Sequence, residues 1–245
     1  MTNPIIDLML AHRSVRQFTT QAVSDETVAL ILQAALTGPN MNNAQPGTFI
    51  ELTNPKFKQL LTATTGQKQI ASAPRTFAVV MDWHKALTGM SATEQAAAKE
   101  NLANYPYLEG GAVSAGVAVG RALLAAQSLG LAGVTYAGIT NAAAELEAQL
   151  NLPAFSKVVM GLSIGYAAED PGIKPKLPIA ASWMKDHYDQ ATVEAQVAAY
   201  NEVMHDYYAQ RGSDLSWTQN NVKGLTHQQD WAAKNAYPRD KGFHF

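Results

Sequence analysis

The chain has 245 residues, a formal net charge of −2 and a charged fraction of 16%. This balance is typical of a globular protein with a sizeable core, and it lacks the basic surface that nucleic-acid binding requires. The chain has no cysteine, which excludes disulfides, thiol chemistry and cysteine-ligated metal sites. The first residues do not form a signal peptide, so we expect a cytoplasmic protein.

Capped helices and apolar strands alternate over the first third of the chain. Asn3, Ser24 and Asn54 are predicted N-caps, because each precedes a run with helical spacing and can accept a backbone N–H of the first turn. Their helices are expected at residues 4–12, 25–37 and 55–65. Strands are expected near residues 48–53 and over residues 75–83, where apolar and β-branched residues gather.

The middle of the chain contains the most apolar segment, residues 111–130. Arg121 lies in its centre and small residues dominate it, so a buried helix over residues 109–128 is expected rather than a membrane span. Asn141 is a predicted N-cap of a short helix. The other elements expected here are a helix over residues 91–104 and strands over residues 133–139 and 157–166.

The amino-acid composition changes after the last predicted strand. Residues 167–178 are rich in proline and glycine, and a long helix is expected from Asp189 to Arg211. The tail beyond it has aromatic residues without a periodic core face, among them Trp217, Phe243 and Phe245, so it needs another surface to pack on. The sequence predicts an α+β core over residues 1–188 and a helical arm over residues 189–245 that packs on a partner chain.

One motif suggests a hydrolase. The segment "GLSIG", residues 161–165, matches the G-x-S-x-G pattern, in which Ser163 would be the nucleophile on a sharp strand-to-helix turn. No convincing helix start follows it, so close packing of small residues in a central strand is favoured. The histidines have no metal-binding spacing, and no nucleotide-binding glycine motif is present. No metal site is therefore expected.

Two short basic segments are candidate anion sites. In "HRSVR", an extended chain would place His12, Ser14 and Arg16 on one face and Arg13 on the other, a set suited to a phosphate. The alternative is a helix end decorated with cations. In "IKPKLP", Lys174 and Lys176 would project the same way, because the proline between them keeps the chain extended. The alternative is a solvated linker with two ordinary lysines.

A third segment concentrates side-chain amides. Asn40, Asn42, Asn43 and Gln45 lie in the loop "PNMNNAQPG". Amides both donate and accept hydrogen bonds, so they suit the edge of a uracil-like ring. Ordinary turn chemistry is the alternative.

Together and in this order, these segments resemble the nitroreductase family, closest to its branch of NADPH-dependent flavin reductases and oxygen-insensitive nitroreductases. The matching pieces are "HRSVRQF", "GQKQIASAPRTFAVVMD", "SLGLAGVTYAGITN", "VVMGLSIGY" and "IKPKLP". The resemblance implies a three-layer fold with a central mixed sheet flanked by helices. It also implies a C-terminal helical arm and an intertwined homodimer that binds FMN at its interface.

The resemblance assigns roles at the phosphate end of the FMN. His12, Arg13 and Ser14 are expected to contact the phosphate or the ribityl chain, and Lys174 and Lys176 to close on the phosphate. No membrane or nucleic-acid partner is implied.

The resemblance also assigns roles around the flavin ring. Arg16 is expected near N1 and the C2 carbonyl, where it would stabilise negative charge, and Gln67 is expected to bond the ring. The backbone amides of Ala137 and Gly138 are expected near N5. The loop expected to line the flavin, from the second subunit, contains Asn40, Met41 and Asn42.

The sequence departs from the family in three places. The flavin loop is not serine-rich, a glycine pair reads Ala137-Gly138, and a basic clamp for the 2′-phosphate of NADPH is reduced to Arg211 with Asp214 nearby. NADPH is the expected electron donor, with NADH as the alternative.

The expected function is an FMN-dependent NAD(P)H oxidoreductase with a ping-pong reaction. Small-molecule acceptors would be nitroaromatics, quinones or flavins, and the flavin rather than a side chain would carry the chemistry. The alternatives are a flavin-binding protein with little turnover and a serine hydrolase that uses Ser163.

Overall fold

A computed structural model describes residues 3–244 of the chain, which form two compact units. Of the described residues, unit 1 comprises 3–171 and 231–244, and unit 2 comprises Gly172–Asp230. Phe245 lies outside the described residues. The expected division into residues 1–188 and 189–245 stays a prediction.

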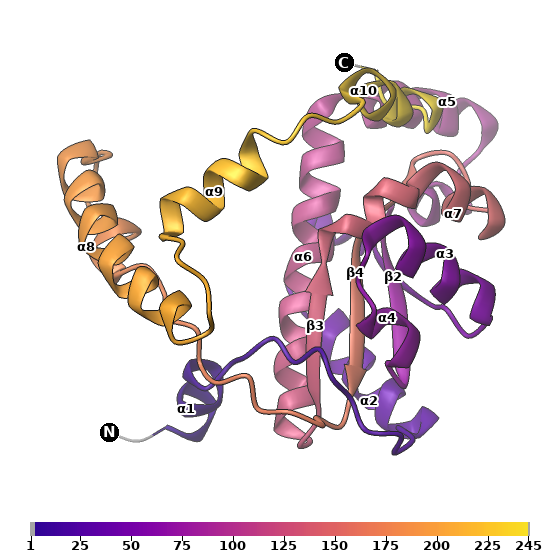
Figure 1. Ribbon diagram of the computed structural model, residues 1–245. Helices are drawn as coiled ribbons and strands as arrows, with labels where there is room; N and C mark the ends of the chain where they lie inside the picture. Colours follow the sequence, from indigo (N-terminus) through magenta and orange to yellow (C-terminus); the bar gives the residue numbers. More distant parts are fainter. Residues whose placement is uncertain (1–2, 245) are drawn as a thin grey trace. The chain divides into compact units, whose positions relative to one another are not determined.

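Unit 1 is built on one sheet, in which the described strands pair antiparallel in the order β1-β2-β4-β3 (Figure 1). The only parallel pairing among the described residues is an isolated bridge between Ser14 and Gly133, beside the first residues of β3. The strands are β1 (Gly47–Glu51), β2 (Arg75–Asp82), β3 (Ala132–Tyr136) and β4 (Ser156–Gly165).

Two helices, α2 (Asp25–Leu36) and α6 (Tyr105–Ser128), cover one face of the sheet (Figure 1). Their small and branched side chains, such as Ile31 and Ala122, pack against Phe77 and Leu162 of the strands. The sequence predicted both helices of this layer, although α6 starts earlier than expected. The helix α6 begins at Tyr105, four residues before the expected start, and Pro106 fits its first turn, where no backbone N–H bond is lost.

The helix α6 is long and apolar enough to cross a membrane, and within the described residues it is alone in this. In this structure 33% of its most apolar window is buried. Ala115, Ala122 and Ala126 are fully buried in the core between α6, α2 and the sheet. One side of α6 therefore faces the core, which agrees in part with the buried helix that the sequence predicted.

The opposite face of the sheet is covered by shorter elements. Leu61, Ile70 and Leu146 from these elements are fully buried against Ala78 and Val80 of β2. The result is a three-layer unit, as Figure 1 shows. The covering elements are α3 (Pro55–Thr65), α4 (Gln69–Ser72), the 3-10 helix η3 (Ala137–Ala142) and α7 (Ala143–Gln149).

The predicted caps are mostly confirmed. Asn3, Ser24 and Asn54 each accept backbone N–H groups at the start of α1 (Pro4–Leu10), α2 and α3. The prediction for Asn141 is wrong. It lies inside η3, and α7 begins after Ala142 without a side-chain cap. The remaining helices before α6 are η1 (Met41–Asn43), η2 (His84–Leu87) and α5 (Ala92–Leu102). Ser91 forms a capping box with Glu94 at the start of α5.

The last helix of the chain, α10 (Trp231–Asp240), belongs to unit 1. Phe243 is fully buried in a cluster with Trp83, Leu102 and Phe155. The tail has an apolar surface to pack on within its own chain, which its aperiodic sequence did not reveal.

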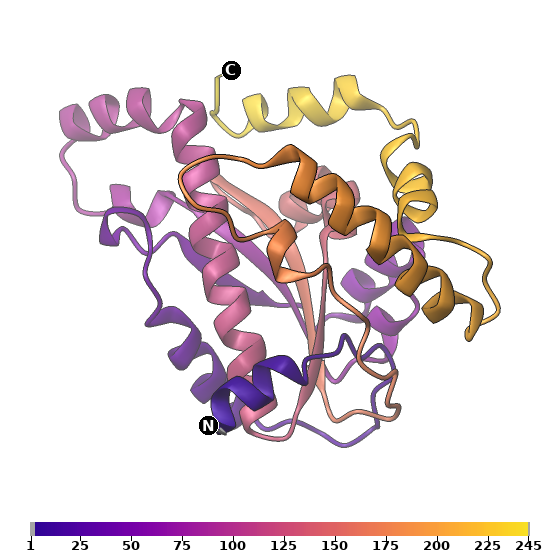
Figure 2. The same cartoon turned by 90° about the vertical axis from the view of Figure 1, so that its left-hand side faces the viewer.

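Unit 2 is centred on α8 (Gln190–Ala209), which Figure 2 shows in orange. Asp189 caps this helix, and Gly212 ends it in a left-handed conformation, both as predicted. The ring of Tyr200 packs edge-on against Trp217 of the next helix. The other helices of unit 2 are η4 (Ile179–Ala181) and α9 (Trp217–Leu225).

Candidate functional site

The basic turn, residues 12–16, lies outside the helix α1 and is extended. This is the conformation that the interpretation as an anion site requires. Ser14 bridges Gly133, and the amide of Val15 donates to the Gly133 carbonyl at 3.3 Å. Val15 is buried and anchors the turn to unit 1, while the Nδ1 atom of His12 lies 3.0 Å from Nε2 of Gln127. The cationic side chains flank a fixed backbone.

Two carboxylates that the sequence did not single out lie against this turn. The Nε of Arg13 forms an ion pair with Asp170 at 2.8 Å. The Oε1 of Glu169 accepts the backbone amides of Arg16 and Gln17 at 3.1 Å each. The signal available in the sequence was the acidic pair a few residues after β4. An anionic ligand of Arg13 must therefore compete with Asp170.

A cavity of about 260 Å³ lies beside the turn. Its polar lining comes from Arg13, Gln127 and Glu169, and part of its apolar lining from Val15 and Leu131. Arg13 and Val15 share this side, which is the alternation expected of an extended chain. The guanidinium of Arg13 therefore lines a partly apolar cavity at the edge of the sheet.

A second group of predicted residues meets at the other end of β3. The left-handed Gly66 ends α3 and turns the chain into Gln67, whose Oε1 accepts from Nε2 of Gln69 at 2.8 Å. A Cβ built on Gly138 would lie 3.6 Å from Nε2 of Gln67 and 3.4 Å from Cγ2 of Thr65. Gln67 and Gly138, far apart in the sequence, are thus neighbours.

The strand β3 separates the two groups. The basic turn bridges Gly133, and Ala137 follows four residues later along the chain. At about 3.3 Å per residue, this places the two groups roughly 13 Å apart along the strand. The site therefore offers cations at one end and amide donors at the other, which suits an elongated ligand with an anionic tail and a polar ring.

The amide-rich loop is seated elsewhere in unit 1. Its 3-10 turn η1 (Met41–Asn43) is held by the Met41 amide, which donates to Oγ of Ser114 at 3.1 Å on α6. Oδ1 of Asn40 accepts the amide of Gln45 at 2.8 Å. Met41 packs in the cluster of Trp83 and Phe243, so within one chain the loop is not joined to Gln67.

The backbone of this loop is strained. Asn42, Asn43 and Gln45 all have φ between 52° and 55°, in the left-handed region. Asparagine tolerates that region better than most residues, which explains the composition of the loop. Part of the amide signal in the sequence therefore reflects turn chemistry.

The late lysines lie in unit 2. The Nζ of Lys174 donates to the Tyr208 hydroxyl at 2.9 Å, and the hydroxyl of Tyr200 donates to the Pro175 carbonyl at 2.8 Å. These bonds fasten the lysine segment to α8. Lys176 is exposed. The expected convergence of both lysines with the basic turn stays a prediction.

Arg211, the predicted contact for a 2′-phosphate, also lies in unit 2. Its guanidinium stacks 3.8 Å above the ring centroid of Tyr207. Asp214, which the sequence placed near it, accepts from Nε2 of His205 at 2.9 Å and raises the pKa of that histidine. The carboxylate is thus engaged with His205.

Ser163 lies within β4 rather than on a turn. It is fully buried, it pairs with Thr76 of β2, and its Oγ lies 3.5 Å from the Thr76 hydroxyl. A nucleophile elbow needs an exposed strand-to-helix turn. The packing interpretation of "GLSIG" therefore fits the structure, and the hydrolase interpretation does not.

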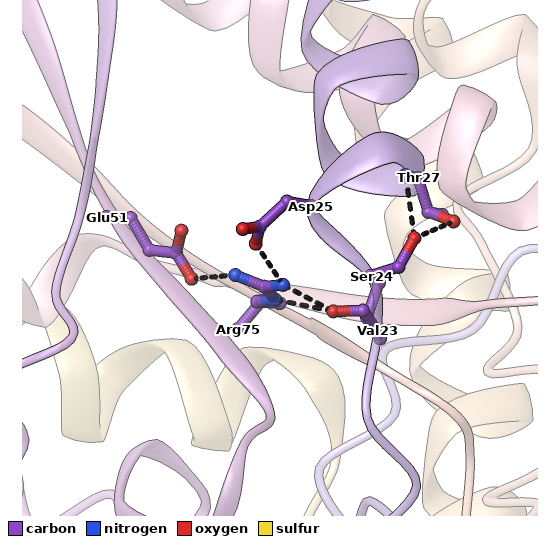
Figure 3. A network of polar contacts seen from close by, with 6 residues as sticks. All are labelled: Val23, Ser24, Asp25, Thr27, Glu51 and Arg75. Atoms are coloured by element: carbon purple, nitrogen blue, oxygen red, sulfur yellow. Dashed lines mark hydrogen bonds and ion pairs between the residues drawn. The ribbon is translucent and has the colours of Figure 1, made fainter.

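Another polar network lies at the start of β2 (Figure 3). The guanidinium of Arg75 bonds Glu51 at 2.9 Å, Asp25 at 2.6 Å and the carbonyl of Val23. Arg75 thereby ties β2 to β1 and to the start of α2. A cavity of about 530 Å³ beside it contains none of the predicted site residues.

The comparisons with known proteins agree with the motifs. The sequence model of the nitroreductase family matches residues 9–166, and that of the nitroreductase family C-terminal domain matches residues 174–245. An NADPH-flavin oxidoreductase of Vibrio harveyi is 29% identical over 221 residues, which cover 89% of this chain and 89% of the relative. An oxygen-insensitive NADPH nitroreductase of Salmonella typhimurium is 29% identical, covering 95% of this chain and 100% of the relative.

A solved structure shows the same fold. The NADPH:FMN oxidoreductase from Vibrio harveyi complexed with NAD+ superposes with a TM-score of 0.85 and 27% sequence identity, covering 98% of this chain and 99% of that one. The family match spans more than half of the chain and includes both the basic turn and the Gln67–Gly138 neighbourhood. The chain therefore belongs to the nitroreductase family.

Proposed function

We propose that the chain is an FMN-dependent NAD(P)H oxidoreductase of the nitroreductase type. The relatives named for NADPH, flavin and FMN reactions support this, since the similarity extends over nearly the whole chain. The single structural observation that carries the proposal is the arrangement along β3, with cations near Gly133 and amide donors near Gly138.

The residues present fit FMN. Arg13, Ser14 and His12 would bind the phosphate and the ribityl chain, because a guanidinium, a hydroxyl and an imidazole all donate to phosphate oxygens. Lys174 and Lys176 would add two further cations from unit 2. Arg13 would exchange part of its ion pair with Asp170 for the phosphate.

The ring end has its own donors. Gln67 would bond the heterocycle, beside the backbone of Ala137 and Gly138. When bound, FMN supplies the transfer of two electrons between a nicotinamide and an acceptor. Arg16 would stabilise the negative charge that this chemistry places on the ring, by the same logic as an oxyanion hole. No side chain need act as a nucleophile, in agreement with the buried Ser163.

The electron donor is NADPH in this proposal, with NADH as the weaker alternative. Arg211 is the proposed contact for the 2′-phosphate, because a guanidinium binds phosphate through paired hydrogen bonds. Nitroaromatics, quinones and flavins are the proposed acceptors, and they would follow the nicotinamide into the same space in a ping-pong reaction.

The functional form is a cytoplasmic homodimer in this proposal. All the apolar side chains of α1 except Leu8 are well exposed, with Leu10 at 73%, and no residue of the helix is buried. A second chain would cover them and would bring Asn40, Met41 and Asn42 to the flavin.

Uptake of FMN and reduction by NADPH test the function. The purified protein is stripped, offered FMN in excess, desalted and examined by visible absorbance, and NADPH or NADH is then added in a stopped-flow instrument without oxygen. We expect a yellow protein that NADPH bleaches within seconds. A yellow protein that does not bleach would indicate a flavin-binding protein, and failure to take up FMN would overturn the proposal.

A further inference from the structure

The C-terminal segment is firmly seated on unit 1. The Phe155 amide donates to the Lys241 carbonyl at 2.8 Å, and the His244 amide donates to the Ala103 carbonyl at 2.6 Å. Phe243 is fully buried, and its ring meets that of Phe155 edge-on at 5.8 Å between centroids. The segment is an integral part of unit 1. Its contacts also hold the preceding helix, α10, in place on this unit.

A buried carboxylate on α7 depends on α10. Glu147 is 1% exposed and accepts the Val158 amide at 2.7 Å. Its other oxygen accepts the hydroxyl of Tyr237 and lies 3.6 Å from Nζ of Lys241. Burying a carboxylate is costly unless it is paired and hydrogen-bonded. Without α10 and the residue after it, Glu147 would lose two of these partners.

A second bond from α10 reaches the element just before α7. The Nζ of Lys234 donates to Oδ1 of Asn141 at 2.6 Å. Asn141 lies in η3, which begins with Ala137 and Gly138 and leads directly into α7. The contacts of α10 therefore fall on both parts of one continuous segment, residues 137–149.

We propose that α10 is a positioning element for the ring end of the site, acting through Lys234 on Asn141 and through Tyr237 on Glu147. This rests on the proposed function for the role of Ala137 and Gly138 toward FMN. Donors that stabilise developing charge must be preorganised, and small displacements of a positioning group lower rates strongly. The bonds from α10 hold the turn that presents those donors.

Hydrogen exchange of the full-length protein tests the bracing, with and without added FMN. Lys234→Met is compared with Lys234→Arg, which keeps a donor, and with Lys223→Met, which removes an exposed lysine of α9. We expect exchange in residues 137–149 to quicken about threefold or more in Lys234→Met and to return toward the wild-type rate in Lys234→Arg. Lys223→Met should match the wild type.

Tyr237→Phe is the second variant, because it removes one bond to Glu147 while it keeps the ring. It should also quicken exchange in residues 137–149 and leave β2 unchanged. Unchanged exchange in both variants, or exchange raised equally in β2, would overturn the proposal.

The midpoint potential of bound FMN gives a readout beyond stability. This potential should shift in Lys234→Met and return to the wild-type value in Lys234→Arg. An unshifted potential in Lys234→Met would show that α10 does not position the ring end of the site. If the wild-type protein takes up no FMN, the proposed function fails, whereas hydrogen exchange still decides whether α10 braces the turn.

Discussion

At the scale of single residues, the basic turn shows that two arginines close together in the sequence can have different surroundings in the structure. Arg13 and Arg16 are neighbours in one short stretch, but Arg13 lies on the side of Val15 and meets Asp170, whereas the backbone of Arg16 is bonded by Glu169. The two arginines therefore have different surroundings. Their substitution should have different consequences.

Arg13→Ala should weaken FMN binding about tenfold or more, because a hydrogen bond to a charged group contributes about 1.5–3 kcal/mol. Asp170→Asn should act in the opposite direction and tighten binding by up to about fivefold, since it frees Arg13 from an exposed ion pair. Quenching of FMN fluorescence on titration with stripped protein measures both affinities.

Arg121→Ala is the matched control, because this arginine bonds the carbonyl of Ala34 between α6 and α2. It should leave the affinity for FMN unchanged. Equal affinities of Arg13→Ala and the wild type would contradict a phosphate role for Arg13.

At the scale of elements, the packing of β3 on β4 depends on one residue without a side chain. The ring of Tyr136 lies directly over Gly161, so that a Cβ there would overlap the ring. Burial raises the pKa of Tyr136 to about 12. This contact fixes the last residue of β3, just before Ala137. The buried strand β4 therefore determines where η3 begins.

Gly161→Ala should destabilise the fold by about 1–3 kcal/mol, because the added methyl group overpacks the core. The cost should be smaller in the background of Tyr136→Val, since all three nearest atoms belong to the Tyr136 ring. Urea unfolding of the wild type, both single variants and the double variant measures the difference. Additive free energies would show that the glycine is needed for another reason.

At the scale of the whole molecule, the proposed homodimer rests on the exposed apolar side chains of α1. Ile5, Ile6 and Met9 are each at least half exposed. Apolar side chains gathered in this way mark an interaction surface.

Sedimentation at micromolar concentration should give twice the mass of one chain. Leu10→Glu should shift the equilibrium toward the monomer, because it places a charge among these apolar side chains. Lys56→Glu, on the exposed side of α3, adds negative charge elsewhere and should stay dimeric. A monomeric wild-type protein would refute the proposed assembly.

The sequence by itself determined most of the long elements, because caps and apolar periodicity are local. Ser24 caps α2, Asp189 caps α8, and the strands at residues 75–82 and 156–165 lie where β-branched runs predicted them. The motifs also identified the family, since they follow one another in the order typical of it. Asn141 was misjudged because a capping residue and a residue inside a 3-10 turn look alike locally.

Only the tertiary structure decided which of these residues meet. It brought Gln67 to Gly138, paired Arg13 with Asp170 and set Glu147 under Tyr237 of the last helix. These pairs are separated by 71, 157 and 90 positions in the sequence. No local preference encodes such contacts, because they form only when buried apolar faces on distant segments pack against the same sheet.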